Sequence, residues 1–324
     1  MTDRAHLGVS SGPMGQGLRV FSLVSLCLVL AYTLNNFLIH VGDARPLISG
    51  GWVVIAVYVL ALALALALSF RQSGHSLQQT ADSFTAFNTY LVRGAFWAVL
   101  LVGLIDATIS FLRIEEFSEV LFGESLAGSL NKQNFRGPYV HIPLVALGFV
   151  IAAFTRGLGF IWLTLLVVLA ELLIVLTVNI YSYEQAFQAD LVRFWYAALF
   201  LFATAYTLLE GGHVRVDVLF AAMPQARKHL VNLWGALILG MPLAWSTLVI
   251  GTWDQSRIIN SPILNYEIGQ QSVGGLYIKY LMAGFLLILG ITMVIQFAAL
   301  MMSSAAGRAQ SAGNAAPETT TSSD

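Results

Sequence analysis

The sequence predicts an all-α polytopic membrane protein with about eight transmembrane helices and additional interfacial amphipathic helices. Of its 324 residues, 57% are hydrophobic and only 10% are charged, whereas about 25% of the residues of a soluble domain are charged. The mean hydropathy is +0.76. Apolar runs recur along the chain, and they reach the length of about 20 residues that a helix needs to cross a membrane.

Eight apolar runs are long enough to span a bilayer. Five of them contain no Asp, Glu, Lys or Arg, and these are residues 20–42, 46–70, 137–155, 230–253 and 280–307. Each of the other three contains a single charged residue, and these are 94–112 with Asp106, 158–180 with Glu171 and 191–209 with Arg193. We therefore expect eight helices that cross the membrane in alternating directions.

Two stretches between the spans are typical of helices that lie in the membrane interface. Residues 71–93 mix polar and aromatic side chains, and a solvated loop is the alternative there. In residues 113–127, helical spacing gathers apolar side chains on one face, namely Ile114, Phe117, Val120 and Leu121.

Lysine and arginine in the short loops predict the orientation, because they concentrate on the cytoplasmic side. The loop 210–229 holds three of them, Arg215, Arg227 and Lys228. This loop is therefore predicted to be cytoplasmic, and eight spans then place both termini in the cytoplasm. The long loop between the third and fourth spans falls on the outer side in this topology, and it holds Arg113, Lys132 and Arg136.

Asp106 and Glu171 are the two acidic residues inside predicted spans. Intramembrane acids are costly and face protein or water, so each is either part of a cation or proton relay or a hydrogen-bonded structural acid. Each is alone in its span, which favours the structural role and predicts an acid without a charged partner.

The stretch EGGHVRVDVLF (residues 210–220) is a polar interruption between two apolar runs. In a helix, Glu210, His213 and Asp217 would share a face and could hold a metal, but Gly211 and Gly212 oppose a helix there. In an extended chain, His213, Arg215 and Asp217 point one way. We therefore interpret Gly211, Gly212, His213, Arg215 and Asp217 as a structural or subunit-interface turn.

Residues 252–277 form a second polar cluster, which is either a connecting loop or a docking surface for a partner. Elsewhere the sequence lacks a nucleophile–base pair, a Walker loop, a Cys/His array and a dinucleotide fingerprint. We expect no enzyme activity, no cofactor and no metal site. The net charge of −1 gives no indication of nucleic-acid binding.

Two segments resemble a known family. The stretches TLLEGGHVRVDVLFAAMP (207–224) and YEIGQQSVGGLYIKYLMAGFLLILG (266–290) are similar to the small, DctQ-type membrane subunit of tripartite ATP-independent periplasmic (TRAP) transporters. The resemblance covers residues 158–301, and the residues of its second motif are Glu267, Ser272, Gly274, Gly275 and Leu276. Typical members have about four spans, so the chain resembles an enlarged form.

This resemblance implies a four-helix core over 158–303 and an N-terminal extension over 1–157 with about four further spans. The small and polar residues over 304–324 predict a disordered cytoplasmic tail. It implies a small permease subunit of a sodium-coupled symporter for an organic acid or related solute in the bacterial inner membrane. The expected partners are a large permease subunit, a periplasmic substrate-binding protein and the lipid bilayer. Five residues would then contribute to periplasmic docking, namely Arg257, Glu267, Ser272, Gly274 and Gly275.

Two rival interpretations remain open at this point. The chain could be the membrane subunit of a redox complex that binds haem or quinone, although no span carries the two histidines that a membrane cytochrome would use. It could also be an independent secondary transporter.

Overall fold

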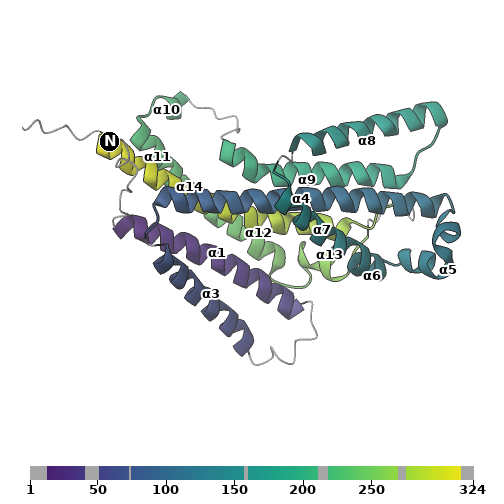
Figure 1. Ribbon diagram of the computed structural model, residues 1–324, viewed down its shortest axis with the longest axis horizontal. Helices are drawn as coiled ribbons and strands as arrows, with labels where there is room; N and C mark the ends of the chain where they lie inside the picture. The colour runs from purple at the N-terminus through teal and green to yellow at the C-terminus, as the bar shows by residue number, and fades with distance from the viewer. Residues whose placement is uncertain are drawn as a thin grey trace, which may run out of the picture. The chain divides into compact units, whose positions relative to one another are not determined.

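The computed structural model describes residues 13–40, 51–72, 74–156, 160–210, 218–268 and 275–314, and within these ranges every regular element is a helix (Figure 1). In chain order the helices are α1 (Pro13–His40), α3 (Trp52–Arg71), α4 (Leu77–Ile114), α5 (Ser118–Leu130), α6 (Gln133–Arg136), the π-helix η1 (Gly137–His141), α7 (Ile142–Phe154), α8 (Phe160–Tyr181), α9 (Ala186–Glu210), α10 (Val218–Ala221), α11 (Gln225–Gly235), the π-helix η2 (Ala236–Gly240), α12 (Met241–Thr252), α13 (Asn260–Leu264) and α14 (Lys279–Asn314).

Eight helical segments in these ranges are long and apolar enough to cross a membrane. They are Pro13–Phe37, Trp52–Arg71, Leu77–Ile114, Gln133–Phe154, Ile161–Tyr181, Ala186–Ala205, Gln225–Thr252 and Lys279–Ser311. Each overlaps one of the eight runs that the sequence indicates. The predicted fold class is confirmed, and the chain is a multi-pass membrane protein.

The regions flanking the spans differ from the prediction in two places. Residues 77–93 are not a separate interfacial helix but the first half of α4, a continuous helix of 38 residues. No proline or glycine lies between Leu77 and Arg93, so nothing in the backbone ends the helix before the apolar run begins. At the other end of the chain, α14 continues to Asn314, so residues 304–314 of the predicted tail are helical.

The second stretch, predicted as a helix over 113–127, contains the separate helix α5 over Ser118–Leu130, and its position in the membrane interface stays a prediction. Its apolar side chains are exposed, and they include Val120, Leu121, Phe122 and Leu126. Gly123 has a φ of 74° and bends the helix at its centre, a backbone conformation that glycine adopts without the penalty other residues incur.

The chain divides into two compact units. Unit 1 takes residues from 1–87, 208–245 and 293–324, and unit 2 takes 88–207 and 246–292. Four helices contribute to both units, namely α4, α9, α12 and α14. The division at residues 157 and 303 that the family resemblance implies is one of sequence similarity, and it stays a prediction.

In unit 1, a buried arginine joins α1 to the end of α3. Arg19, which is 1% exposed, donates hydrogen bonds to the backbone oxygens of Gln72 at 2.7 Å and His75 at 2.6 Å. These carbonyls follow the last turn of α3, where backbone oxygens lack helical partners. Arg19 is therefore held inside the protein by the groups that it caps.

Unit 2 has an aromatic core between α4, α9 and α14. Phe202 lies edge-on to Phe96 and to Phe285, with ring centroids 5.5 and 5.0 Å apart. Where α4 meets α7 the backbones approach so closely that a Cβ on Gly148 would lie 2.5 Å from the backbone nitrogen of Ala98. This close packing fixes the part of α4 that carries the site described next.

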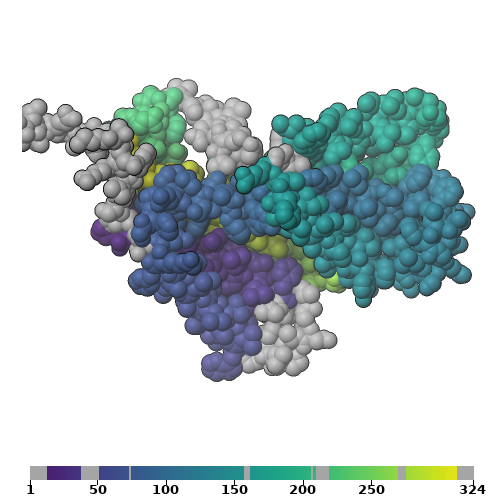
Figure 2. Space-filling model, in the orientation of Figure 1, coloured from purple at the N-terminus to yellow at the C-terminus, as the bar shows by residue number. Residues whose placement is uncertain are grey.

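Two spans, α3 and α8, expose most of their side chains (Figure 2). Ala65 is the buried residue of α3, and Leu163 is the buried residue among the α8 side chains that the structure describes. Such surface is compatible with lipid or with another membrane helix.

Candidate functional site: a buried polar network

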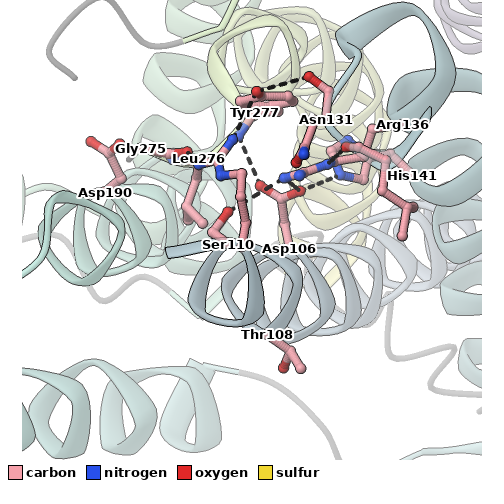
Figure 3. A network of polar contacts seen from close by, with 12 residues as sticks. Asp106, Thr108, Ser110, Asn131, Arg136, His141, Asp190, Gly275, Leu276 and Tyr277 are labelled. Carbon is pink, nitrogen blue, oxygen red and sulfur yellow. Dashed lines mark hydrogen bonds and ion pairs between the residues drawn. The ribbon is translucent and has the colours of Figure 1, made fainter. Parts of the chain in front are cut away.

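Asp106 lies at the centre of a polar network inside unit 2 (Figure 3). Its side chain is fully buried. Its Oδ1 accepts hydrogen bonds from Arg136 Nη1 at 2.8 Å and bonds His141 Nε2 at 3.0 Å, and its Oδ2 accepts one from the backbone N–H of Tyr277 at 2.8 Å. The prediction of an acid without a charged partner is therefore wrong for Asp106.

Arg136 ends the short helix α6 and is also completely buried. Besides Asp106, it donates from Nε to the backbone oxygen of Leu130 at 2.9 Å and from Nη1 to Ser110 Oγ at 3.3 Å. Its guanidinium carbon lies 4.1 Å from the ring centroid of Tyr277, within the range of a cation–π interaction. The sequence places Arg136 in an outer loop, whereas the structure buries it as the counter-ion of Asp106.

His141 reaches the network because the backbone changes its pitch just before it. The π-helix η1 begins at Gly137 and carries Pro138, which has no N–H to donate to the helical ladder. Gly137 is also where the backbone meets the ring of Tyr266, because a Cβ there would lie 2.5 Å from that ring. Single π-turns of this kind often re-aim side chains at functional positions.

His141 bridges Asp106 and Tyr280. Its Nδ1 lies 2.6 Å from the Tyr280 hydroxyl, and the two rings stack with centroids 5.8 Å apart. An ionised Asp106 accepts only, so Nε2 carries a proton in that state, and in the neutral imidazole Nδ1 accepts the Tyr280 hydroxyl proton. The three side chains form a continuous hydrogen-bonded chain from α4 through η1 to α14.

A second set of contacts holds the segment just before α14. Arg113 donates to the Tyr277 hydroxyl at 2.8 Å and to the backbone oxygen of Gly275 at 3.1 Å. The Tyr277 hydroxyl donates to the backbone oxygen of Asn131 at 3.1 Å, and the backbone N–H of Leu276 donates to Asp190 Oδ2 at 3.1 Å. Residues 275–277 are therefore bound by α4, by α9 and by the end of α5.

The predicted docking residues that the structure describes are Arg257, Glu267 and Gly275. Glu267 forms a salt bridge with Lys279 of 2.6 Å, and Ser261 donates a hydrogen bond to it at 3.1 Å. The hydrogen bond from Lys279, followed by that from Ser261, lowers the pKa of the Glu267 carboxyl below its usual value, although partial burial opposes the shift. Arg257 instead lies over the ring of Trp253, 4.5 Å from its centroid.

The other sequence-predicted residues fall elsewhere. Glu171 is exposed on α8 and belongs to no hydrogen bond or ion pair of the part of the chain that is described. The predicted interface turn and two docking residues lie outside the described residues, and these are Gly211, Gly212, His213, Arg215, Asp217, Ser272 and Gly274. In the described ranges, no three His, Cys, Asp or Glu side chains come together as metal ligands.

Sequence reasoning missed Arg136, His141, Arg113 and Tyr277 as members of one network. The one available signal is that Arg136 directly precedes the run 137–155, which contains Pro138, His141 and Pro143. A cation and a histidine beside an interrupted helix indicate a polar contact inside a membrane protein, but not which acid they meet.

Comparison with known proteins adds no relative. No protein-family model matches the chain, and neither a curated protein nor a solved structure matches it.

Proposed function

We propose that this chain is the small permease subunit of a sodium-coupled TRAP transporter in the bacterial inner membrane, with an organic acid or a related small solute as the transported substrate. It would hold the large permease subunit in place and help to receive a periplasmic binding protein. The motifs at residues 207–224 and 266–290 support the family, and the eight spans support a membrane subunit.

The observation that carries this proposal is the set of hydrogen bonds that holds residues 275–277 in place. These residues lie within the motif segment 266–290 and begin with Gly275, which the resemblance assigns to docking. They are bound by Asp106, Arg113 and Asp190. A docking surface works best when it is rigid before its partner arrives, because less conformational freedom is then lost on binding.

Successive spans cross the membrane in opposite directions, so the place of this segment follows from the chain order. The end of α4 and the starts of α9 and α14 share one side, opposite to the loop 210–229. The excess of lysine and arginine in that loop predicts that it is cytoplasmic. Residues 275–277 would then face the periplasm, where a soluble binding protein is available.

The chemistry of the network also suits a scaffold. The negative charge of Asp106 is balanced by Arg136, and its two oxygens bond protein groups from three directions. A carboxylate that coordinates a transported cation must exchange ligands as the cation arrives and leaves. Asp106 would have to break a buried ion pair to do so, which is costly.

Transport in liposomes tests the proposal. The large subunit and its binding protein should take up substrate when this chain is present and not when it is omitted, and this chain alone should transport nothing. Arg113→Ala removes the hydrogen bonds to the Tyr277 hydroxyl and to the Gly275 carbonyl. It should weaken docking and raise the concentration of binding protein needed for half-maximal uptake.

Sodium dependence separates a scaffold from a part of the coupling path. Glu171→Gln should leave the sodium dependence of uptake unchanged. A shifted sodium dependence with assembly intact, or uptake by this chain alone, would overturn the proposed division of labour. Haem absorbance of the purified protein would instead indicate the redox alternative.

A further inference from the structure

The helix α8 presents an unusual surface for a membrane span. Its apolar side chains are exposed over most of its length, and they include Ile161, Leu165, Val168, Leu172, Val175 and Leu176. Glu171 lies in the middle of this helix, exposed and without a bonding partner among the residues described. A carboxyl group, ionised or protonated, carries hydrogen-bonding capacity that lipid tails cannot satisfy.

The depth of Glu171 excludes the usual escape to the membrane surface. It is separated by 11 residues from Phe160 and by 10 from Tyr181, the two ends of α8. At a rise of 1.5 Å per residue, both ends are about 15 Å or more away along the axis. A glutamate side chain is too short to carry its carboxyl group to either interface.

The helix α3 supplies the comparison. It is as exposed as α8, but its single charged residue is Arg71 at its end, from where the guanidinium can reach the interface. α3 has the composition of a helix that faces lipid, whereas α8 has the same exposure with an acid at mid-depth. Glu171 is therefore the feature that distinguishes α8 from a helix that faces lipid.

We propose that the face of α8 around Glu171 packs, in the membrane, against a transmembrane helix of a different polypeptide that carries a lysine or arginine at the same depth. Intramembrane charges pair with one another inside protein, and small clusters of polar contacts join membrane helices. This inference goes beyond the proposed function, since it names the face and the chemistry of its partner and holds whichever membrane protein that partner is.

Two other occupants fit less well. A second copy related by an axis along the membrane normal keeps every residue at its own depth, so at an α8–α8 contact it presents another Glu171 and no opposite charge. Within the chain, Arg193 on the neighbouring helix α9 lies 3.4 Å from Asp190, and Asp190 in turn binds the backbone of Leu276. Arg193 is thus already associated with the network side of unit 2.

Photo-crosslinking in native membranes tests the proposal on the full chain. A benzoylphenylalanine is placed at Val175, one turn from Glu171, and at Leu60 on α3 as the matched control, since both positions are exposed. The Val175 probe should form an adduct with another polypeptide whose contacting span contains a lysine or arginine near its centre. The Leu60 probe should form no adduct with a polypeptide.

Charge dependence decides the result. Glu171→Leu, which suits an apolar helix, should reduce the adduct about 3- to 20-fold at equal abundance of the chain, the range expected for one polar contact between membrane helices. Glu171→Lys combined with an acid in place of the partner's cation should restore it. An adduct only with a second copy or with lipid, an adduct insensitive to Glu171→Leu, or a partner without a mid-span cation would overturn the proposal. If uptake requires this chain but the Val175 probe forms no adduct, the proposal is also overturned, whereas the proposed function stands.

Discussion

Asp106→Asn should destabilise the protein strongly, although the two side chains have nearly the same shape. The substitution removes the negative charge and leaves the Arg136 guanidinium buried without its counter-ion. Both side chains are 0% exposed, and the pair is 2.8 Å apart, so water does not compensate for the loss.

The structure sets the size of this effect. Breaking a buried ion pair by removing one partner costs about 3–5 kcal/mol. The amide oxygen of asparagine can still accept the backbone N–H of Tyr277, so the loss falls on the contacts with Arg136 and His141. We expect the free energy of unfolding to fall by about 3–5 kcal/mol, measured by denaturant titration in detergent micelles.

Two further variants show whether the charge pair is the cause. Asp106→Leu combined with Arg136→Met removes both charges, so it should cost less than Asp106→Asn alone, because no unpaired charge stays buried. Lys279→Met is the exposed control: the Lys279–Glu267 bridge is 2.6 Å long, but its side chains are 39% and 30% exposed. Its loss should cost at most about 1 kcal/mol.

The reasoning would be refuted if Asp106→Asn were as mild as Lys279→Met. It would also be refuted if the double variant lost as much free energy of unfolding as Asp106→Leu and Arg136→Met lose separately when added together, because the two charges would then act independently.

Three other predictions concern single contacts. The hydrogen bond from Lys279 holds the pKa of Glu267 below its usual value, so the bridge should stabilise the protein above about pH 4.3 and cease to do so as the pH falls through the lowered pKa. Glu267→Gln should be less stable than the wild type at pH 7 by at most about 1 kcal/mol, and a difference in stability that persists at pH 2 would contradict this. Burial and the 2.7 Å hydrogen bond to Glu115 raise the pKa of Tyr183 to about 12, so the contribution of Tyr183 to stability should be complete below about pH 10 and disappear between pH 10 and 12. Tyr183→Phe should remove that part of the pH dependence of stability, and an ultraviolet titration of the tyrosines that this substitution leaves unchanged would argue against the raised pKa. Gly148→Ala should lower the free energy of unfolding by about 1–3 kcal/mol, because its Cβ would lie 2.5 Å from a backbone nitrogen of α4 that no side-chain rotation can move. A thermal-unfolding midpoint equal to that of the wild type would show instead that the two helices can move apart at no cost.

The eight spans are determined by the sequence alone. A backbone in lipid must satisfy its own hydrogen bonds, so a run of about 20 apolar residues has few alternatives to a helix. The residues that flank a span are less constrained. Residues 77–93 have amphipathic spacing that suits either a separate interfacial helix or an extension of the span, and the absence of a helix breaker before Gly94 decides for the extension.

The polar network could not be predicted in the same way. Sequence identified Asp106 as an acid inside a span, but its partners Arg136, His141 and Tyr277 are 30, 35 and 171 residues away. Their meeting depends on how α4, α6, η1 and the segment before α14 pack, which hydrophobic periodicity does not specify. Glu171 has the same sequence signature as Asp106, a single acid in an apolar run, yet it is exposed and Asp106 is fully buried. The sequence determined that both acids lie at membrane depth, because helix formation in lipid is local; only the tertiary structure decided which of them has a partner, because pairing charges is a property of neighbouring helices.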